Sequence, residues 1–523
     1  MTVQLHLTSS GWRETAKGLK QRGVCWQSAE QLLETISSTK ISKTLLQQNG
    51  FYALVWERGG QLFAAVDHVR SIPLFYALKD GSFFLSDDAE WVREQVDNTT
   101  MDEIAKEEFQ LTGYVTGQDT LYPDVKQLQA GEFLSINTSS ESLQLKTERY
   151  YRFLHTEPEN YDEQALYQQL DTAALASIDN LIRYANGRQI VIPLSGGYDS
   201  RLIATLLKRR GYENILTFTY GVPGNKESAY SKKVADALGL KWYFVEYSNK
   251  LWREAWQTEE RWQYQKWASG WNSIAHVQDW LAVKILKQNS IIENDCIFVP
   301  GHSGDFVAGS HIPDMAFQEK TLNLIASCQA TLSRHYSLAP RSKFEVGEAF
   351  WLNKIKENME FEDFSSNVKF ADSFEKWDWQ ERQAKFICNS VRVYEFYDYD
   401  WWMPLWDREF MFFWEKVPLR LRKGREWYLE YVKQVFAETS VIALKRELNN
   451  ASDDSNIKAL IKNSFFYNRK YFYFFARKIY SIFIMEKSSL AYESWFSADF
   501  YNKHKNDGYC INGMLAKDFL NRE

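Results

Sequence analysis

Short apolar runs recur along the first third of the chain, separated by polar or glycine-containing stretches. The runs at 49–56 and 61–66 are joined by 57–60, which contains two glycines, and this arrangement is typical of a β-hairpin. Residues 67–76 and 81–86 continue the pattern, and a helical stretch follows at about 101–112. We therefore expect a β-rich domain over residues 1–150.

The pattern changes after a polar linker at 155–160. A helix is expected at about 161–185, and continuous apolar runs then alternate with helical stretches. The expected strands are 190–194, 214–221, 242–246 and 297–300. Such alternation predicts an α/β fold with a doubly wound parallel sheet, whose ligands bind at the carboxyl ends of the strands. We expect this domain at 160–450 and a helical C-terminal extension at 451–523.

The first of these strands is followed directly by Ser195, Gly196, Gly197, a tyrosine, Asp199 and Ser200. Two glycines allow a sharp turn with no side chain in the way, and the helix expected at 199–210 begins there. Free N–H groups and the positive end of a helix attract anions, and the two serine hydroxyls add donors. An aspartate at this place can hold the magnesium that a polyphosphate carries.

This Ser-Gly-Gly-x-Asp-Ser pattern resembles the pyrophosphate loop of the N-type ATP pyrophosphatases, which cleave ATP between its α and β phosphates. The resemblance implies ATP and Mg²⁺ as cofactors. No Gly-Lys-Ser/Thr follows at the right spacing, so the loop is not a Walker A loop. The alternative interpretation is an ordinary tight turn between a strand and a helix.

The strand at 297–300 leads into a second glycine-rich turn at 301–309. This turn resembles the "GEGxDE" turn of asparagine synthetase-like enzymes, which implies that Asp305 binds the metal together with Asp199. His302 stands where relatives carry a residue that deprotonates the attacking amine, and histidine suits that role. The alternatives are a simple turn aspartate and a histidine that only hydrogen-bonds the turn. Gly221 and Gly301, which follow two of the strands, are further candidates for nucleotide contacts.

Residues 394–407 resemble the "E-x-R-x-P-F-L-D" segment of the same family. Counting back from the proline places Asp400 on the family glutamate, where it would orient His302, and Glu395 is a second candidate. The family has a basic loop that steadies pyrophosphate. Lys423 or Arg425 would serve there electrostatically.

The N-terminal domain resembles the glutamine amidotransferase domain of asparagine synthetases, with a "DH-x(4)-PL-x-Y" segment at 67–76. The resemblance implies a sandwich of antiparallel sheets. The family places its nucleophilic cysteine directly after the start methionine, whereas this chain has Thr2 there and its first cysteine is Cys25. We expect a domain degenerate for glutamine hydrolysis. Nitrogen would come from ammonia, from a separate glutaminase subunit or from an amine on the substrate.

Taken together, the motifs predict an ATP-dependent ligase that adenylates a carboxylate and forms an amide. The sequence around Ser195 and His302 resembles most the family members of bacterial surface-polysaccharide clusters, which implies amidation of a sugar carboxylate such as a uronic acid. A peptide or small-molecule cyclase, similar to lasso-peptide cyclases or β-lactam synthetases, is one alternative, and a non-catalytic scaffold is another. Genomic neighbours would separate these alternatives.

Composition adds limits. The net charge of −6 disfavours nucleic acid as a partner, and five scattered cysteines favour a reducing cytoplasm. We find no pattern of a signal peptide and no apolar run long enough to span a membrane. The aromatic and basic stretch at 464–480 fits contact with a membrane surface or, as we prefer, a packed helix. The sequence does not specify an oligomeric state.

Overall fold

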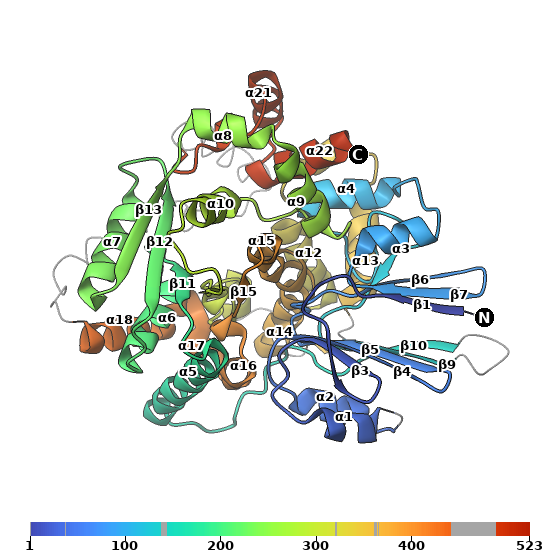
Figure 1. Ribbon diagram of the computed structural model, residues 1–523, viewed down its shortest axis with the longest axis horizontal. Coiled ribbons are helices and arrows are strands. Elements are labelled where there is room, and N and C mark those ends of the chain that lie inside the picture. Colours follow the sequence, from blue (N-terminus) through green and yellow to red (C-terminus); the bar gives the residue numbers. More distant parts are fainter. Residues whose placement is uncertain are drawn as a thin grey trace.

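The protein folds as two sheet-containing halves joined by helices (Figure 1). The computed structural model describes residues 2–36, 38–137, 144–318, 322–359, 363–364, 366–440 and 488–523. The predictions for the stretch at 464–480 lie outside the described residues. Figure 1 places the N-terminal sheets at one end of the molecule and the parallel sheet at the other.

The N-terminal half is a sandwich of two sheets with helices on both outer faces, so the expected β-rich sandwich is confirmed. The expectation of antiparallel sheets holds except for β1, which pairs parallel with β7. One sheet has the order β1-β7-β6-β8 and the other β10-β9-β5-β4-β3-β2. The predicted hairpin is β4 and β5, which pair antiparallel from Ala53↔Val66 to Arg58↔Gln61. The side chains of both sheets that face inward form a common buried core.

The strands of this half are β1 (Thr2–His6), β2 (Arg13–Ala16), β3 (Leu19–Gly23), β4 (Tyr52–Arg58), β5 (Gln61–Val66), β6 (Phe75–Lys79), β7 (Ser82–Ser86), β8 (Lys126–Gln127), β9 (Glu132–Asn137) and β10 (Gln144–Arg149). Its helices are α1 (Ala29–Thr35), α2 (Ile41–Gln47), α3 (Ala89–Gln95) and α4 (Glu103–Thr112).

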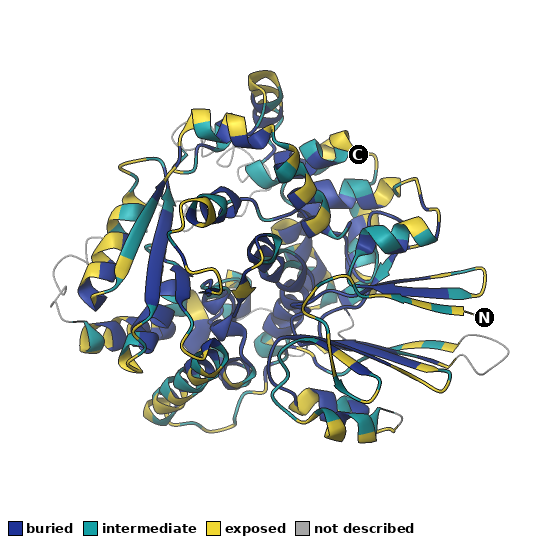
Figure 2. Cartoon of the chain, viewed as in Figure 1, coloured by how far each residue is buried: buried dark blue, intermediate teal, exposed yellow. Residues whose placement is uncertain are grey.

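The second half is built on a five-stranded sheet of order β13-β12-β11-β14-β15 in which every pair is parallel. The predicted doubly wound sheet is thus confirmed. Its strands are β11 (Ile190–Pro193), β12 (Ile215–Gly221), β13 (Lys241–Glu246), β14 (Ile297–Phe298) and β15 (Asp400–Trp401). The central strand β11 is apolar and mostly buried because helices cover both faces of the sheet. Figure 2 shows the neighbouring strand β12 as buried.

Helices α5 (Glu163–Ala185), α6 (Tyr198–Arg209) and α18 (Glu426–Thr439) pack on one another beside β11. The other helices of this half are α7 (Lys226–Leu238), α8 (Asn249–Trp256), α9 (Glu259–Ser269), α10 (Trp280–Gln288), α11 (Gly304–Val307), α12 (Leu324–His335), α13 (Glu348–Met359), α14 (Asn367–Asp378), α15 (Arg392–Phe396), α16 (Arg408–Trp414) and α17 (Leu419–Arg422). The chain ends with α21 (Ala498–Asn506) and α22 (Ile511–Arg522).

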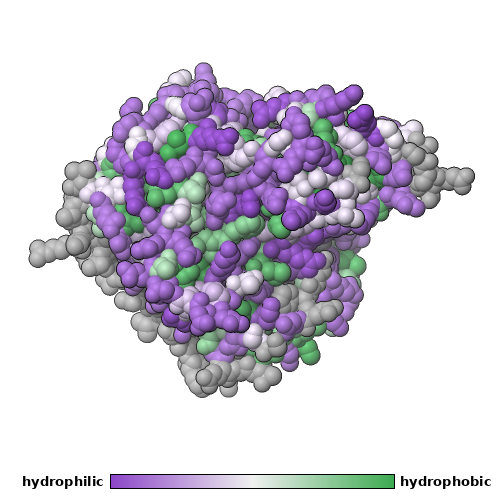
Figure 3. Space-filling model, turned by 90° about the horizontal axis from the view of Figure 1, so that it is seen from below, coloured by the Kyte–Doolittle hydropathy of each residue, from purple (hydrophilic) through white to green (hydrophobic). Residues whose placement is uncertain are grey.

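Buried contacts join the two halves. His68 of the sandwich lies 2.7 Å from the Trp406 carbonyl through Nε2, and its own carbonyl accepts from Trp379 Nε1 at 2.9 Å. The C-terminal helix α22 packs on α4 of the sandwich through Phe519 and Phe109. The face seen in Figure 3 is mostly hydrophilic, with a hydrophobic strip across its middle. Within the described ranges, no helix combines the length and the apolar character needed to cross a bilayer.

Candidate nucleotide and acyl-transfer site

The predicted anion loop follows β11 and opens α6. Gly197 is the N-cap of α6 and supplies no side chain, so the first-turn amides of the helix are not capped by that residue. The Ser195 amide donates to Ser200 Oγ at 3.2 Å, and the Gly197 amide donates to Ser195 Oγ at 3.1 Å. Ser195 and Gly197 are exposed, so the loop presents hydroxyl and amide donors at the carboxyl end of the central strand.

The second turn approaches the first so closely that it requires glycine. A Cβ on Gly301 would lie 2.8 Å from the Ser200 amide nitrogen. A Cβ on Gly304 would lie 2.6 Å from both Asp199 Oδ1 and Tyr428 Oη. The two glycines therefore let α11, which carries Asp305, contact the first turn of α6.

This contact brings the two predicted metal ligands together. Burial, and then the nearby carboxylate of Asp305, raise the pKa of Asp199 to about 7. The two carboxylates repel each other, and a divalent cation bound between them would relieve that repulsion. The described residues contain no cluster of three or more acidic, histidine or cysteine side chains able to hold a metal ion. Magnesium commonly binds one or two carboxylates plus phosphate oxygens, so the Asp199 and Asp305 pair fits a Mg²⁺ ion that arrives with a nucleotide.

Two groups from α18 and the loop before it complete this carboxylate centre. Buried Tyr428 donates its hydroxyl to Asp199 Oδ1 at 2.8 Å, and the positive charge of Arg425 lowers the pKa of Asp199. Arg425 is therefore the basic residue that the fold brings toward the carboxylates. Lys423 is exposed, and its Nζ lies 6.0 Å from the centre of the Phe317 ring. The sequence analysis did not identify Tyr428, because no motif distinguishes a tyrosine that binds a carboxylate from the other tyrosines of an amphipathic helix.

Asp305 has a histidine neighbour as well. His311 Nε2 lies 3.7 Å from Asp305 Oδ2, and its Nδ1 lies 2.5 Å from buried Asp378 Oδ2. Since Asp378 holds one side of the ring, the other nitrogen faces the carboxylate centre. Sequence reasoning did not identify this pair, which comes from segments 67 residues apart.

His302 lies on the second turn, but the expected partner does not reach it. Its ring centre is 6.2 Å from that of His276, and burial together with His276 lowers the pKa of His302 to about 4. Asp400 instead forms an ion pair with Arg188 at 2.5 Å. Asp400 is paired with Ile297, at the amino end of β14, whereas His302 follows the carboxyl end of that strand. The expected contact between Asp400 and His302 is therefore wrong, because the two residues lie toward opposite ends of the parallel strands.

Glu395, the second candidate partner, is also engaged elsewhere. Its carboxylate lies 2.7 Å from Arg22 Nη2 and 2.7 Å from Arg392 Nη1, and it accepts from Trp401 Nε1. Arg22 belongs to the N-terminal sandwich, so Glu395 helps to join the two halves. The structure does not bring it to His302 either.

Gly221, expected near the nucleotide, lies at the end of β12 beneath a segment from the C-terminal part of the chain. Its φ is 138°, which L side chains rarely adopt, and a Cβ there would lie 2.6 Å from the Ser489 carbonyl oxygen. The next amide, that of Val222, donates to this same carbonyl at 2.7 Å. Trp495 holds the segment in place by stacking on Trp256, with ring centres 5.1 Å apart. The chain near residue 489 therefore borders the carboxyl edge of the sheet.

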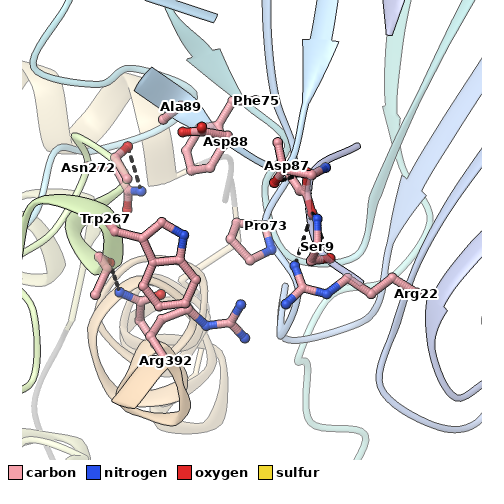
Figure 4. A pocket seen from close by; sticks show the side chains of 14 residues that line it. Ser9, Arg22, Pro73, Phe75, Asp87, Asp88, Ala89, Trp267, Asn272 and Arg392 are labelled. Atoms are coloured by element: carbon pink, nitrogen blue, oxygen red, sulfur yellow. Dashed lines mark hydrogen bonds and ion pairs between the residues drawn. The ribbon is translucent and has the colours of Figure 1, made fainter. Parts of the chain in front are cut away.

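A separate pocket of about 450 Å³, open mouth included, lies where the sandwich meets α9 and α15 (Figure 4). Asp87 and Arg22 face each other on one wall at 3.2 Å, and Trp267 stands on the other with 41% of its surface exposed. The pocket is lined by Thr8, Ser9, Arg22, Pro73, Phe75, Asp87, Asp88, Ala89, Trp267, Ala268, Gly270, Asn272, Asn389 and Arg392. None of the residues that the sequence predicted for the nucleotide, the metal or catalysis is among them.

The N-terminal nucleophile position lies away from these features. Thr2 is exposed and bonds Ser82 Oγ at 2.9 Å, and Figure 1 shows the N-terminus at the outer end of the sandwich. Cys25 donates its thiol to Gln48 Oε1 at 2.7 Å, and burial raises the pKa of the thiol to about 12. A thiol with that pKa contains almost no thiolate at neutral pH, so Cys25 is a poor nucleophile.

Comparisons with known proteins agree with the two halves of this fold. Residues 12–151 match the family model for a glutamine amidotransferase domain, and residues 183–282 match that for asparagine synthase. The two matches, in this order, are those expected of an asparagine synthetase-like family. The resemblance inferred from the motifs is therefore confirmed, and the matches support an ATP-dependent carbon–nitrogen ligase.

Solved structures give only distant likenesses. An NH₃-dependent NAD synthetase from Campylobacter jejuni is 18% identical, with 29% of this chain and 61% of that chain covered and a TM-score of 0.20. A predicted tRNA methyltransferase subunit from Methanocaldococcus jannaschii is 16% identical, with 32% of this chain and 74% of that chain covered and a TM-score of 0.16. Glutamine phosphoribosylpyrophosphate amidotransferase from B. subtilis is 11% identical, with 55% of this chain and 63% of that chain covered and a TM-score of 0.17. This chain thus spans about three fifths of the NAD synthetase, and TM-scores this low support no inference. No curated protein matches the chain significantly.

Proposed function

We propose that this protein is an ATP-dependent ligase that adenylates a carboxylate and then transfers ammonia or an amine to it, with release of AMP and pyrophosphate. One observation carries the proposal. The loop at 195–200 and the carboxylates of Asp199 and Asp305 converge at the carboxyl ends of two neighbouring parallel strands. Phosphate donors and a magnesium-binding pair at the same edge of a sheet suit a nucleotide triphosphate.

Each group has a proposed role. Ser195, Gly196, Gly197 and Ser200 would bind phosphate oxygens, with Gly221 and Gly301 near the nucleotide. Asp199 and Asp305 would hold Mg²⁺, which neutralises charge on the phosphates. Arg425, or the more distant Lys423, would steady pyrophosphate as it leaves. His302 is a candidate to receive the proton of the attacking amine, and neither Asp400 nor Glu395 is placed to assist it.

The chemistry needs two steps. A carboxylate oxygen of the acceptor attacks the α phosphorus of ATP, and the bond to the β phosphate breaks. The nitrogen then attacks the acyl carbon, AMP leaves with the electrons of the acyl–oxygen bond, and the nitrogen loses a proton. The Ser195 and Gly197 region would bind the leaving phosphates, and its exposed donors at the N-terminus of α6 support this role.

We further propose a sugar carboxylate, such as a uronic acid of bacterial surface polysaccharide, as the acceptor. Support comes from the resemblance around Ser195 and His302. A peptide or small-molecule cyclase and a non-catalytic scaffold are the rival functions. The proposed domains are residues 1–150, 160–450 and 451–523. A cytoplasmic location fits the need for ATP and the free state of all five cysteines.

The test is carboxylate-dependent exchange of labelled pyrophosphate into ATP, with Mg²⁺ and without any amine. Free uronic acids, nucleotide-linked uronic acids and short peptides would be offered separately. Exchange with one class identifies the acceptor, and amide should appear when an ammonium salt is added. ADP and phosphate as products would contradict the adenylation step. Exchange with peptides alone would favour the cyclase, and no exchange with any carboxylate would favour the scaffold.

A further inference from the structure

A second imidazole lies beside His302 on a different segment. His276 is in the loop between α9 and α10, and most residues around it, from 271 to 283, are buried. Its side chain keeps 13% of its surface exposed. The His276 and His302 rings meet edge to face, with centres 6.2 Å apart and an angle of 73° between their planes. His276 is therefore a partly accessible ring next to the second turn.

A buried carboxylate orients this ring. His276 Nδ1 lies 3.1 Å from Asp279 Oδ1, and Asp279 is 4% exposed. The other oxygen of Asp279 accepts a hydrogen bond from Tyr394 Oη at 2.9 Å. Tyr394 in turn stacks on Phe298 of β14, with ring centres 4.4 Å apart. The carboxylate is thus fixed to the same strand that leads into the turn carrying His302 and Asp305.

Among the described residues, His276 forms its side-chain hydrogen bond through Nδ1. An ionised carboxylate only accepts hydrogen bonds, so Nδ1 of His276 carries the hydrogen in this contact. Nε2 then keeps its lone pair. A histidine with Nδ1 held by a buried aspartate and Nε2 free is the arrangement that enzymes use for a general base, and the aspartate also stabilises the imidazolium that forms.

We propose that His276, oriented by Asp279, is the base that accepts the proton of the attacking ammonia or amine. This inference rests on the proposed function. As the nitrogen bonds to the acyl carbon, its proton passes to Nε2 of His276, and AMP leaves with the electrons of the broken acyl–oxygen bond. The imidazolium then returns its proton to solvent, since the side chain is not fully buried. Asp279 acts as a positioning residue.

The pair supplies what His302 lacks. The carboxylate expected beside His302, that of Asp400, instead forms an ion pair with Arg188 at the amino end of the strands. Burial and the neighbouring His276 lower the pKa of His302 to about 4, which makes it a weak base at neutral pH. His302 would remain a neutral hydrogen-bonding group on the turn.

The experiment separates adenylation from nitrogen attack. In His276→Ala, amide formation should fall by about a hundredfold or more, whereas carboxylate-dependent pyrophosphate exchange should stay within about twofold of the original protein. Added imidazole should restore part of the amide rate. Asp279→Asn should lower kcat for amide formation with little change in the KM of the carboxylate. The matched control is Gln278→Ala, a partly exposed neighbour, which should retain both activities.

The outcomes are distinct. Normal amide formation in His276→Ala, or loss of exchange and amide formation together, overturns the proposal. If His302→Ala shows the split and His276→Ala does not, His302 is the base. If the original protein shows no carboxylate-dependent exchange, the proposed ligase function itself fails, and the result is distinguishable from a failure of His276 alone.

Discussion

The two halves of this chain each contain a sheet and each match a family model, but they differ in how their reactive groups are arranged. In the parallel-sheet half, segments near residues 199, 305 and 428 converge on one edge, and the fold admits no side chain at Gly301 and Gly304. In the sandwich, Thr2 is exposed at the outer end of a strand and the Cys25 thiol is protonated. A sheet architecture by itself therefore says little about chemistry, and the convergence of side chains is the better guide to where to look for function.

The largest loss of activity is expected when the carboxylate centre is neutralised. Asp199→Asn and Asp305→Asn should each lower pyrophosphate exchange by at least about a hundredfold, because each removes one of the two charges proposed to hold Mg²⁺. Exposed Asp314→Asn is the matched control and should exchange normally. Exchange that persists in either site variant would mean that the carboxylates do not serve the nucleotide.

A smaller effect is expected from crowding the same centre without changing its charge. The Cβ of Gly304→Ala would lie 2.6 Å from Asp199 Oδ1 and 2.9 Å from Leu405 Cδ1, so the second turn must move away from α6. We expect a loss of about tenfold in exchange, since such displacement weakens a positioned site. Gly347→Ala, which meets nothing within 4 Å, is the control. Equal rates in both alanine variants would show that the close approach is not needed.

The carboxylate centre should also cost stability. The pKa of Asp199 is about 7 in the folded protein against 3.8 for the free group, so the folded state binds more protons between these values. Stability therefore falls as the pH rises from about 4 to about 7, and Asp199→Asn should remove that fall. Without nucleotide, we expect this variant to gain on the order of a few kcal/mol at pH 8 and clearly less near pH 4.5. Urea unfolding at both pH values measures it, and an equal change at the two would contradict the assignment.

The sequence predicts much of this site because its signals are local. An apolar strand, two glycines and a helix start specify the loop at 195–200, and parallel strands bring Asp305 to the same edge as Asp199. The predicted contact between Asp400 and His302 is wrong, because counting residues along the motif does not show at which end of a strand a residue lies. Asp400 sits opposite Ile297, five residues before His302, or roughly 15 Å along an extended chain. Tyr428 and the pair of His276 and Asp279 carry no motif, and only the packing of distant segments reveals them.

The smallest expected effect belongs to the N-terminal half, where the comparison predicts no change at all. Thr2→Ala removes an exposed hydroxyl that hydrogen-bonds Ser82, and Cys25→Ser replaces a half-buried thiol that donates to Gln48. A threonine hydroxyl is a poor nucleophile at neutral pH, and Cys25 contains almost no thiolate. We therefore expect both variants to form amide from ammonium salts at the original rate.

We also expect the original protein to release no glutamate from glutamine. The assay supplies ATP, Mg²⁺, the accepted carboxylate and either nitrogen source. Glutamate formed in step with amide, and lost in Thr2→Ala, would show that the sandwich has kept its chemistry and that the two halves do not differ in the way described.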